Sequence, residues 1–264
     1  MKNFNFVLFI LVWVSVSHAQ DFEVSPVTLL FNAEPGESLA KTITITNHAN
    51  KATSITLNID EYEPGSNVVK TNATTDKRSC KNFISLSPQI LEMQPNEQKQ
   101  VIVNLQVPFD DYSTRWAIIY AQTAKERTSF TADKKLAAGM SVSARIGVKV
   151  IQSPKSNLKY AVKILNLKEI TTDKDTSRIF SAEIANIGEK IAKCKVYLVA
   201  SNLSTGEEVQ FEPTNIETFP DLTHEVKLYM PKNKLAIGRY ALAAILDYGS
   251  QSALEGTQIL LDVK

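Results

Sequence analysis

A row of apolar side chains that ends beside a lysine is the pattern in this chain best suited to binding chemistry. Residues 139–154 read GMSVSARIGVKVIQSP, with apolar residues at every second position from Met140 to Val150 and Lys149 on the opposite parity. Because side chains alternate between the faces of a strand, the pattern predicts one long β-strand with an apolar face. Such a strand can bury its apolar row within its own domain, or it can offer part of that row to a partner's strand.

The alternating row has two interpretations, and the sequence leaves both open. Either the apolar side chains pack in the core of their own domain, as is usual for strands of a β-sandwich, or they contact a strand of a partner protein. Taken alone, Lys149 is predicted to be a solvated strand lysine, which on an edge strand also discourages aggregation.

Other residue types that carry chemistry do not cluster. His48 and His224 are expected in separate domains, and no spacing of His, Cys and carboxylates matches a metal site. The motifs of nucleophile elbows, phosphate loops and zinc proteases are absent from the sequence. Asp110 and Asp111 lie in a predicted loop without the other ligands of a calcium site. The sequence therefore predicts no catalytic residue, no metal and no cofactor.

Residues 1–19 have the features of a signal peptide. Lys2 precedes an apolar stretch, residues 4–16, that is short for a membrane span, and Ser17-His18-Ala19 is a small-x-small cleavage site. We expect an exported mature chain that begins at Gln20 and resides in the periplasm or cell envelope.

Charge and cysteine content exclude some classes of partner. The chain has 29 Lys and Arg against 28 Asp and Glu, which argues against nucleic acid or an anionic membrane as the main partner. No segment after the leader approaches the length of a membrane span. Export permits a disulfide, but Cys80 and Cys194 are expected in different domains. Two independent, partly buried thiols are favoured, and an interdomain bridge is the alternative.

Strand patterns separated by turns predict an all-β chain. The predicted strands include residues 42–46, 54–59, 98–107, 116–121, 160–167, 179–186, 193–201, 225–229, 240–246 and 258–263. This spacing favours antiparallel β-sandwiches, and the polar stretch Ser153–Asn157 is the best boundary. We therefore predict two sandwich domains in tandem, residues 20–153 and 154–264.

Taken together, these residues resemble the periplasmic pilus-assembly chaperones of the PapD type. Val24–Phe31 is similar to the first strand of that family, and Thr42–Asn47 is similar to its next strand, which ends in asparagine. Val148–Pro154 resembles the end of the family's long last strand of domain 1, where a lysine precedes a proline by five residues. The resemblance implies two Ig-like sandwiches and a non-enzymatic protein that caps exported pilin-like or surface-protein subunits by β-strand addition.

The resemblance also implies site residues by position. In the family, alternating apolar residues of the long strand fill the groove of a subunit that lacks its own final strand. The residues at the matching positions here are Met140, Val142 and Ala144. In the family, a lysine at the position of Lys149 and an arginine from the first strand bind the subunit's C-terminal carboxylate. Here the arginine position holds Thr28, and the position before the linker proline, usually arginine, holds Ser153. Arg145 is a possible substitute, about 13 Å from Lys149 along an extended strand.

Three functions make different structural predictions. A chaperone-like module predicts that residues 140–150 lie at or near an exposed edge and that Lys149 reaches a cleft between the domains. A structural or adhesive two-domain surface protein predicts a covered strand and no basic cleft. An enzyme or small-ligand binder predicts a deep pocket with convergent polar groups.

Overall fold

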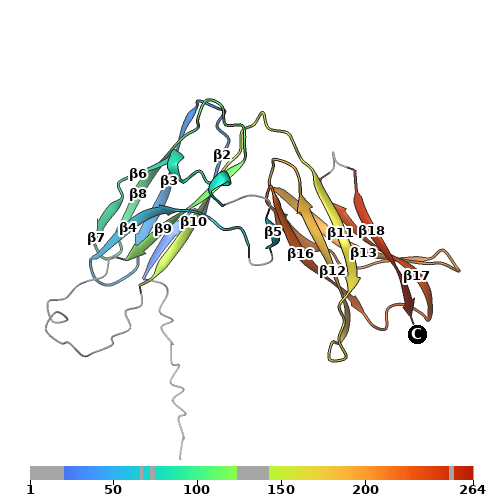
Figure 1. The fold of residues 1–264 in the computed structure, drawn as a ribbon. Helices are drawn as coiled ribbons and strands as arrows, with labels where there is room; N and C mark the ends of the chain where they lie inside the picture. Colours follow the sequence, from blue (N-terminus) through green and yellow to red (C-terminus); the bar gives the residue numbers. More distant parts are fainter. Residues whose placement is uncertain (1–20, 66–67, 72–74, 124–142, 250–252, 264) are drawn as a thin grey trace, which may run out of the picture.

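The computed structural model describes residues 21–65, 68–71, 75–123, 143–249 and 253–263. In these ranges the chain forms two β-sandwiches that are joined at one end and set at an angle to each other (Figure 1). Helical structure in the same ranges consists of two 3₁₀ turns, η1 (Thr75–Arg78) and η2 (Lys81–Phe83). The prediction of an all-β chain with two sandwich domains is confirmed. The predicted signal peptide lies outside the described residues.

Two sheets form the first sandwich. The first has the order β1 (Phe22–Ser25), β3 (Ser38–Asn47), β8 (Gln98–Gln106) and β6 (Ile84–Ser87). The second has the order β2 (Thr28–Phe31), β10 (Arg145–Gln152), β9 (Arg115–Thr123), β4 (Thr53–Asp60) and β7 (Ile90–Met93). Of these pairs only β10 and β2 are parallel, which differs from the purely antiparallel sheets predicted.

Two sheets also form the second sandwich. One has the order β11 (Val162–Glu169), β12 (Ser177–Asn186), β16 (Leu222–Pro231) and β5 (Val68–Thr71). The other has the order β14 (Glu208–Gln210), β13 (Ala192–Asn202), β17 (Gly238–Asp247) and β18 (Glu255–Val263), with β15 (Thr214–Thr218) also paired to β13.

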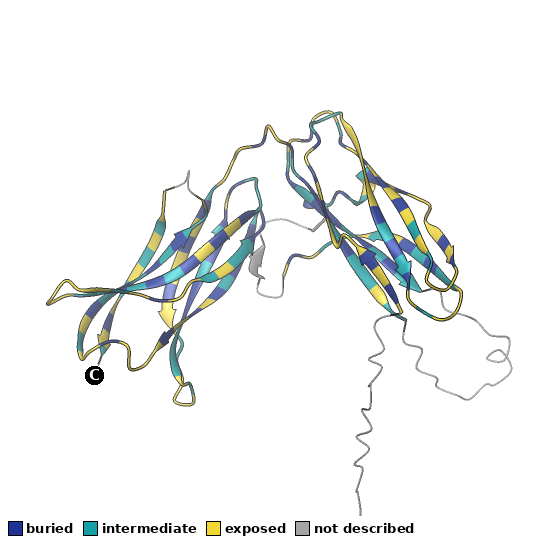
Figure 2. Ribbon diagram, turned by 180° about the vertical axis from the view of Figure 1, so that it is seen from behind, coloured by how far each residue is buried: buried dark blue, intermediate teal, exposed yellow. Residues whose placement is uncertain are grey.

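The period-two patterns of the sequence produce this architecture. In β3, Ile43 and Ile45 are fully buried while Thr42 and Thr44 point away from the core, as alternation in a strand requires. Buried and exposed bands alternate along most strands of both sandwiches (Figure 2). Each sandwich has a large hydrophobic cluster of its own, so each half of the molecule has its own core. A third, small cluster of buried residues joins residues from both halves of the chain: Trp116, Phe219 and Leu222.

One strand crosses the predicted domain boundary. The boundary between residues 153 and 154 lies in the connection from β10 to β11, but β5 leaves the first half of the chain to pair antiparallel with β16. The two strands lie side by side in Figure 1. The predicted division into residues 20–153 and 154–264 therefore does not match the sheets fully. The strand β5 belongs to the first of these segments but forms the edge of a sheet in the second sandwich.

Among the described residues, no helix has both the length and the apolar character needed to span a membrane.

The two cysteines lie in different cores. Cys80 belongs to the cluster of the first sandwich and Cys194 to that of the second, and both thiols are free. The prediction of two independent thiols is confirmed, although both residues are almost fully buried and not partly buried as predicted. Burial raises the pKa of Cys80 to about 12 and the pKa of Cys194 to about 11, because a thiolate is poorly solvated in these surroundings.

We predict that neither thiol reacts with a disulfide reagent at pH 8 until the protein opens. The thiolate is the reactive form, and burial disfavours it as well as blocking access. The native protein should react at least about a thousandfold more slowly than the urea-unfolded protein, measured as absorbance of the released thiolate. A Ser85→Cys variant, with the new thiol at an exposed position of β6, is the control and should add one fast-reacting group. Fast reaction of Cys80 or Cys194 in the folded wild type would contradict the burial described here.

Candidate functional site

The strand β10 is flanked by β9 along its whole length and by β2 along only half of it. The antiparallel register with β9 covers all eight residues of β10. The parallel register with β2 begins only at Lys149, opposite Thr28. Within the described ranges, no strand pairs with this edge of β10 over residues 145–148. The first half of β10 therefore has one open edge.

The main-chain groups at the open edge can be assigned from the register. The amide of Lys149 donates to the carbonyl of Val27 at 2.9 Å, so the odd-numbered residues of β10 direct their N–H and C=O groups toward the edge that β2 occupies. Arg145 and Gly147 have the same orientation but precede the start of β2. A partner strand in line with β2, and likewise parallel to β10, would end beside Lys149.

The apolar row of β10 packs within its own sandwich where the structure describes it. Val148 and Val150 are fully buried in the core, and Ala144 and Ile146 are half-buried and pack against it. Met140 and Val142 lie outside the described residues. The groove-filling role of all three predicted residues, Met140, Val142 and Ala144, stays a prediction.

The opposite face of β10 carries the two cations and directs them to different places. The guanidinium carbon of Arg145 lies 3.3 Å from the ring centroid of Tyr120, and its Nη2 lies 3.9 Å from Oδ2 of Asp60. Lys149 instead reaches the space between the sandwiches. Arg145 is not part of that cleft, so it does not complete a pair of cations with Lys149.

Lys149 lies between two aromatic rings and a carboxylate. Its Nζ lies 3.4 Å from Oε2 of Glu217, a residue of β15 in the second sandwich. The same nitrogen lies 5.2 Å from the ring centroid of Tyr62 and 5.7 Å from that of Phe219. The ring faces attract the ammonium group and the carboxylate neutralises it, so Lys149 is held in place by both sandwiches.

An open cleft of about 830 Å³ surrounds Lys149. The polar and charged residues that line it include Thr28, Asn32, Thr114, Lys149, Ser153, Lys190, Lys193 and Glu217. Three lysines against one glutamate make the lining cationic, which favours an anionic group. Thr28 lies beside Lys149 as the parallel register requires, but it contributes a hydroxyl and no charge.

Lys190 holds the linker to the second sandwich. Its Nζ donates to Oγ of Ser153 and to the carbonyl of Pro154, both at 2.8 Å. Burial lowers the pKa of Lys190, and the charge of Glu34 opposes this shift. Lys190 thus uses two of its three donors within the protein.

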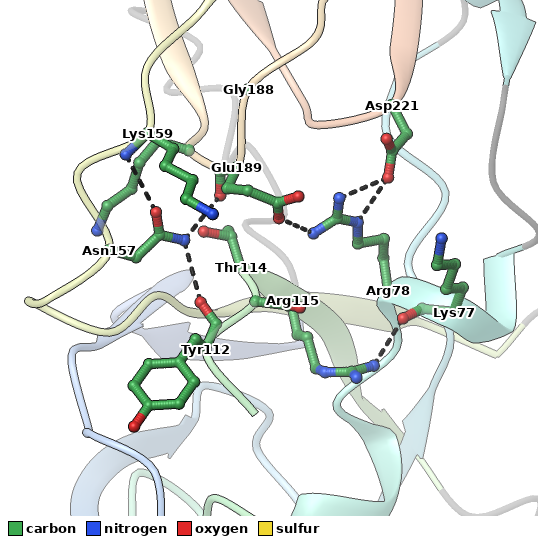
Figure 3. Close-up of polar contacts among 12 residues, drawn as sticks. Lys77, Arg78, Tyr112, Thr114, Arg115, Asn157, Lys159, Gly188, Glu189 and Asp221 are labelled. Atoms are coloured by element: carbon green, nitrogen blue, oxygen red, sulfur yellow. Dashed lines mark hydrogen bonds and ion pairs between the residues drawn. The ribbon is translucent and has the colours of Figure 1, made fainter. Parts of the chain in front are cut away.

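The segment that carries η1 ties the two sandwiches together through Arg78. Figure 3 shows the guanidinium of Arg78 between Asp221 and Glu189 of the second sandwich. Its Nη2 lies 2.5 Å from Oδ2 of Asp221 and its Nη1 lies 2.6 Å from Oε2 of Glu189. Burial alone would lower the pKa of Arg78, but the hydrogen bonds to Glu189 and Asp221 outweigh it, so that pKa is raised. The buried charge is therefore fully paired.

Further contacts between the sandwiches surround this ion pair. Asn157 in the linker donates to the carbonyls of Tyr112 at 3.0 Å and Glu189 at 3.3 Å (Figure 3). Trp116 of β9 packs edge-on against Phe219, with ring centroids 5.1 Å apart and planes at 82°. Polar and apolar contacts together fix the two walls of the cleft relative to each other.

Within the ranges that the structure covers, no group of three His, Cys, Asp or Glu residues is placed to hold a metal ion. His48 lies at an exposed position with its Nε2 3.2 Å from Oε2 of Glu23, as expected of a turn residue. His224 is buried, and its Nε2 has no hydrogen-bond partner among the described residues.

Sequence reasoning missed the residues that meet across the domain boundary. These residues come from three separate parts of the chain, and none belongs to a local motif: Arg78, Glu189, and the neighbouring Glu217 and Asp221. The one local signal in the sequence is Pro220, a residue type common in turns, which is followed by Asp221 with a positive φ of 64°. That signal indicates a turn and says nothing of the arginine that the turn contacts.

No protein-family model matches the chain, and neither does any curated protein sequence. Several solved structures are similar to it. A structure of a chaperone–tip adhesin complex described as vital for CFA/I fimbriae biogenesis is 13% identical with a TM-score of 0.48, over 91% of this chain and 98% of that one. The E. coli chaperone DraB is 11% identical with a TM-score of 0.44, over 90% and 98%. The Pseudomonas aeruginosa chaperone CupB2 is 12% identical with a TM-score of 0.42, over 92% and 100%.

We predict that Arg78→Met destabilises the protein by about 1–3 kcal/mol, because it leaves Glu189 and Asp221 without their cation. The partners are partly exposed, with side-chain accessibilities of 36% and 29%, so water limits the loss. Urea unfolding measures the change. Arg178→Met is the matched control: it removes a bidentate arginine pair with Glu169 inside the second sandwich and should cost less than about 1 kcal/mol. Equal effects of the two substitutions would mean that the Arg78 pair does not hold the sandwiches together.

Proposed function

We propose that this protein is an exported, non-enzymatic chaperone of the periplasm or cell envelope that binds a β-strand of a pilin-like or surface-protein subunit. The subunit strand adds to β10 at residues 145–148, and its C-terminal carboxylate lies in the cleft near Lys149. One observation carries this proposal: the uncovered edge of β10 ends directly at a lysine in a cationic cleft. Neither the edge nor the cleft requires a catalytic group, a cofactor or a metal.

The uncovered edge supports strand addition because main-chain groups there are available for pairing. Arg145 and Gly147 direct their amides and carbonyls outward in the orientation that β2 satisfies from Lys149 onward. Pairing of this kind gives affinity through the main chain and specificity through alternate side chains. A strand parallel to β10 brings its carboxyl end, rather than its amino end, to Lys149.

The cleft supports recognition of a chain end because its cations exceed its anions. A terminal carboxylate is a compact anion, and a charge-assisted bond from Nζ of Lys149 suits it. The hydroxyl of Thr28 lies next to that lysine on the neighbouring strand and is available as a neutral donor. This arrangement differs from the lysine–arginine pair that the resemblance implies, since no second cation stands at position 28.

A structural or adhesive two-domain module is the alternative, and one observation favours it. Val148 and Val150 are buried in the core of their own sandwich, as in any ordinary sandwich strand. On that interpretation the open edge is a strand end without a ligand, and the lysines of the cleft serve only to join the domains.

The test is a substitution that removes one open-edge donor and leaves the hydrogen bonds between β10 and β9 in place. Gly147→Pro removes an amide that points away from β9, and proline is tolerated at strand edges of this kind. Gly147→Ala keeps the amide and adds the same Cβ. In both variants this Cβ comes within 2.7 Å of Cδ1 of Ile118 and 3.3 Å of Cε1 of Tyr120, so the flexible end of Ile118 must shift equally in both. We expect wild type and Gly147→Ala, but not Gly147→Pro, to recover one β-rich exported subunit from the native cell envelope, as identified by mass spectrometry.

Far-ultraviolet circular dichroism and a urea midpoint measure whether each variant folds. Equal recovery of the subunit by all three folded proteins would exclude pairing at this edge. Recovery of no subunit by folded wild type would favour the structural module.

A further inference from the structure

We propose that Glu217 is an internal counter-ion that a partner's terminal carboxylate must displace from Lys149, and that it thereby sets how tightly the cleft holds the partner's chain end. This inference rests on the proposed function, because it concerns the same cleft. It adds a residue from the second sandwich to a site otherwise built on β2 and β10.

The position of Glu217 supports this role. Its carboxylate reaches across the domain boundary to Nζ of Lys149 at 3.4 Å, and it is the one acidic residue among the described residues that line the cleft. On β13, Lys193 is its cross-strand neighbour and lines the same cleft. Glu217 thus lies between a lysine of each sandwich, where an incoming anion would also be drawn.

On β2 and β10, Lys149 is the one cation among the described residues that line the cleft, so neither strand offers a second cation beside it to share two carboxylates. Thr28 beside it is neutral, and Arg145 is engaged with Tyr120 and Asp60 outside the cleft. Two carboxylates close to one ammonium group repel each other, so a second carboxylate binds best when the first withdraws. Binding of a chain end is therefore an exchange of one anion for another, with a smaller net gain than binding to an unpaired lysine.

Exposure makes such an exchange feasible. The side chains of Lys149 and Glu217 are 25% and 34% accessible, so water solvates the displaced carboxylate and screens the pair. Ion pairs of this exposure typically contribute little, which keeps the exchange reversible. A carrier that must later release its partner needs an affinity that is limited in this way.

The experiment compares two peptides that differ only at the chain end. Both are soluble ten-residue peptides that alternate valine with threonine or lysine, one with a free carboxylate and one with a C-terminal amide. Calorimetry at low ionic strength gives the ratio of their affinities for the full-length mature protein. We expect Glu217→Gln to raise the preference for the carboxylate by about threefold. Glu212→Gln, at an exposed position outside the cleft, is the matched control and should leave the ratio unchanged.

Lys149→Met distinguishes the inference from the proposed function. In that variant the two peptides should bind equally, with or without Glu217→Gln. If Lys149→Met abolishes the preference but Glu217→Gln leaves it unchanged or lowers it, the inference fails and the proposed function stands. If neither peptide binds wild type, or if the preference survives without Lys149, both fail.

Discussion

The path of the chain from β1 to β2 determines why one edge of β10 is open. The chain pairs with β3 from Phe22 to Ser25, crosses to the other sheet at Pro26, and joins β10 only from Thr28. At about 3.3 Å per residue, β2 cannot reach back along β10 to Arg145 without giving up its pairing in the first sheet. The open edge thus follows from how one short segment is divided between two sheets. It does not require any strand to come loose.

The cleft depends on a second constraint, which is the fixed relation of the two sandwiches. Lys149 and Glu217 belong to different sandwiches, so their contact persists only while the sandwiches keep their orientation. The ion pairs of Arg78, the packing of Trp116 on Phe219 and the pairing of β5 with β16 all join residues of the first half of the chain to the second sandwich. A chain end that enters the cleft meets a site that is already formed, which lowers the entropy cost of binding.

The fold was largely predictable from the sequence, whereas the cleft was only partly so. Strands such as β3 and β8 bury one face, and that burial imposes an alternation that can be read directly. The crossing strand β5 has four residues and pairs through the main chain with a strand in the other half of the chain, so it leaves no such pattern. Arg78 follows Thr75, Asp76 and Lys77, a composition typical of a solvated turn. In the structure it is nevertheless buried and paired with carboxylates that lie far from it in the sequence. The cleft position expected for Lys149 came from the family resemblance and not from its local pattern.

The balanced charge of the whole chain does not describe the charge of the cleft. The total of +1 argues against a broad anionic surface as partner, and such partners need an extended basic stripe. Screening confines the effect of each charge to about 8 Å at physiological salt, so the local set of Lys149, Lys190, Lys193 and Glu217 determines what the cleft attracts. Glu217 already neutralises part of that set of charges. The cleft therefore suits a single compact anion that takes the place of the Glu217 carboxylate, and it suits less well a polymer that brings many negative charges. A single carboxylate at the end of a strand paired to β10 meets both the charge and the geometry of this site.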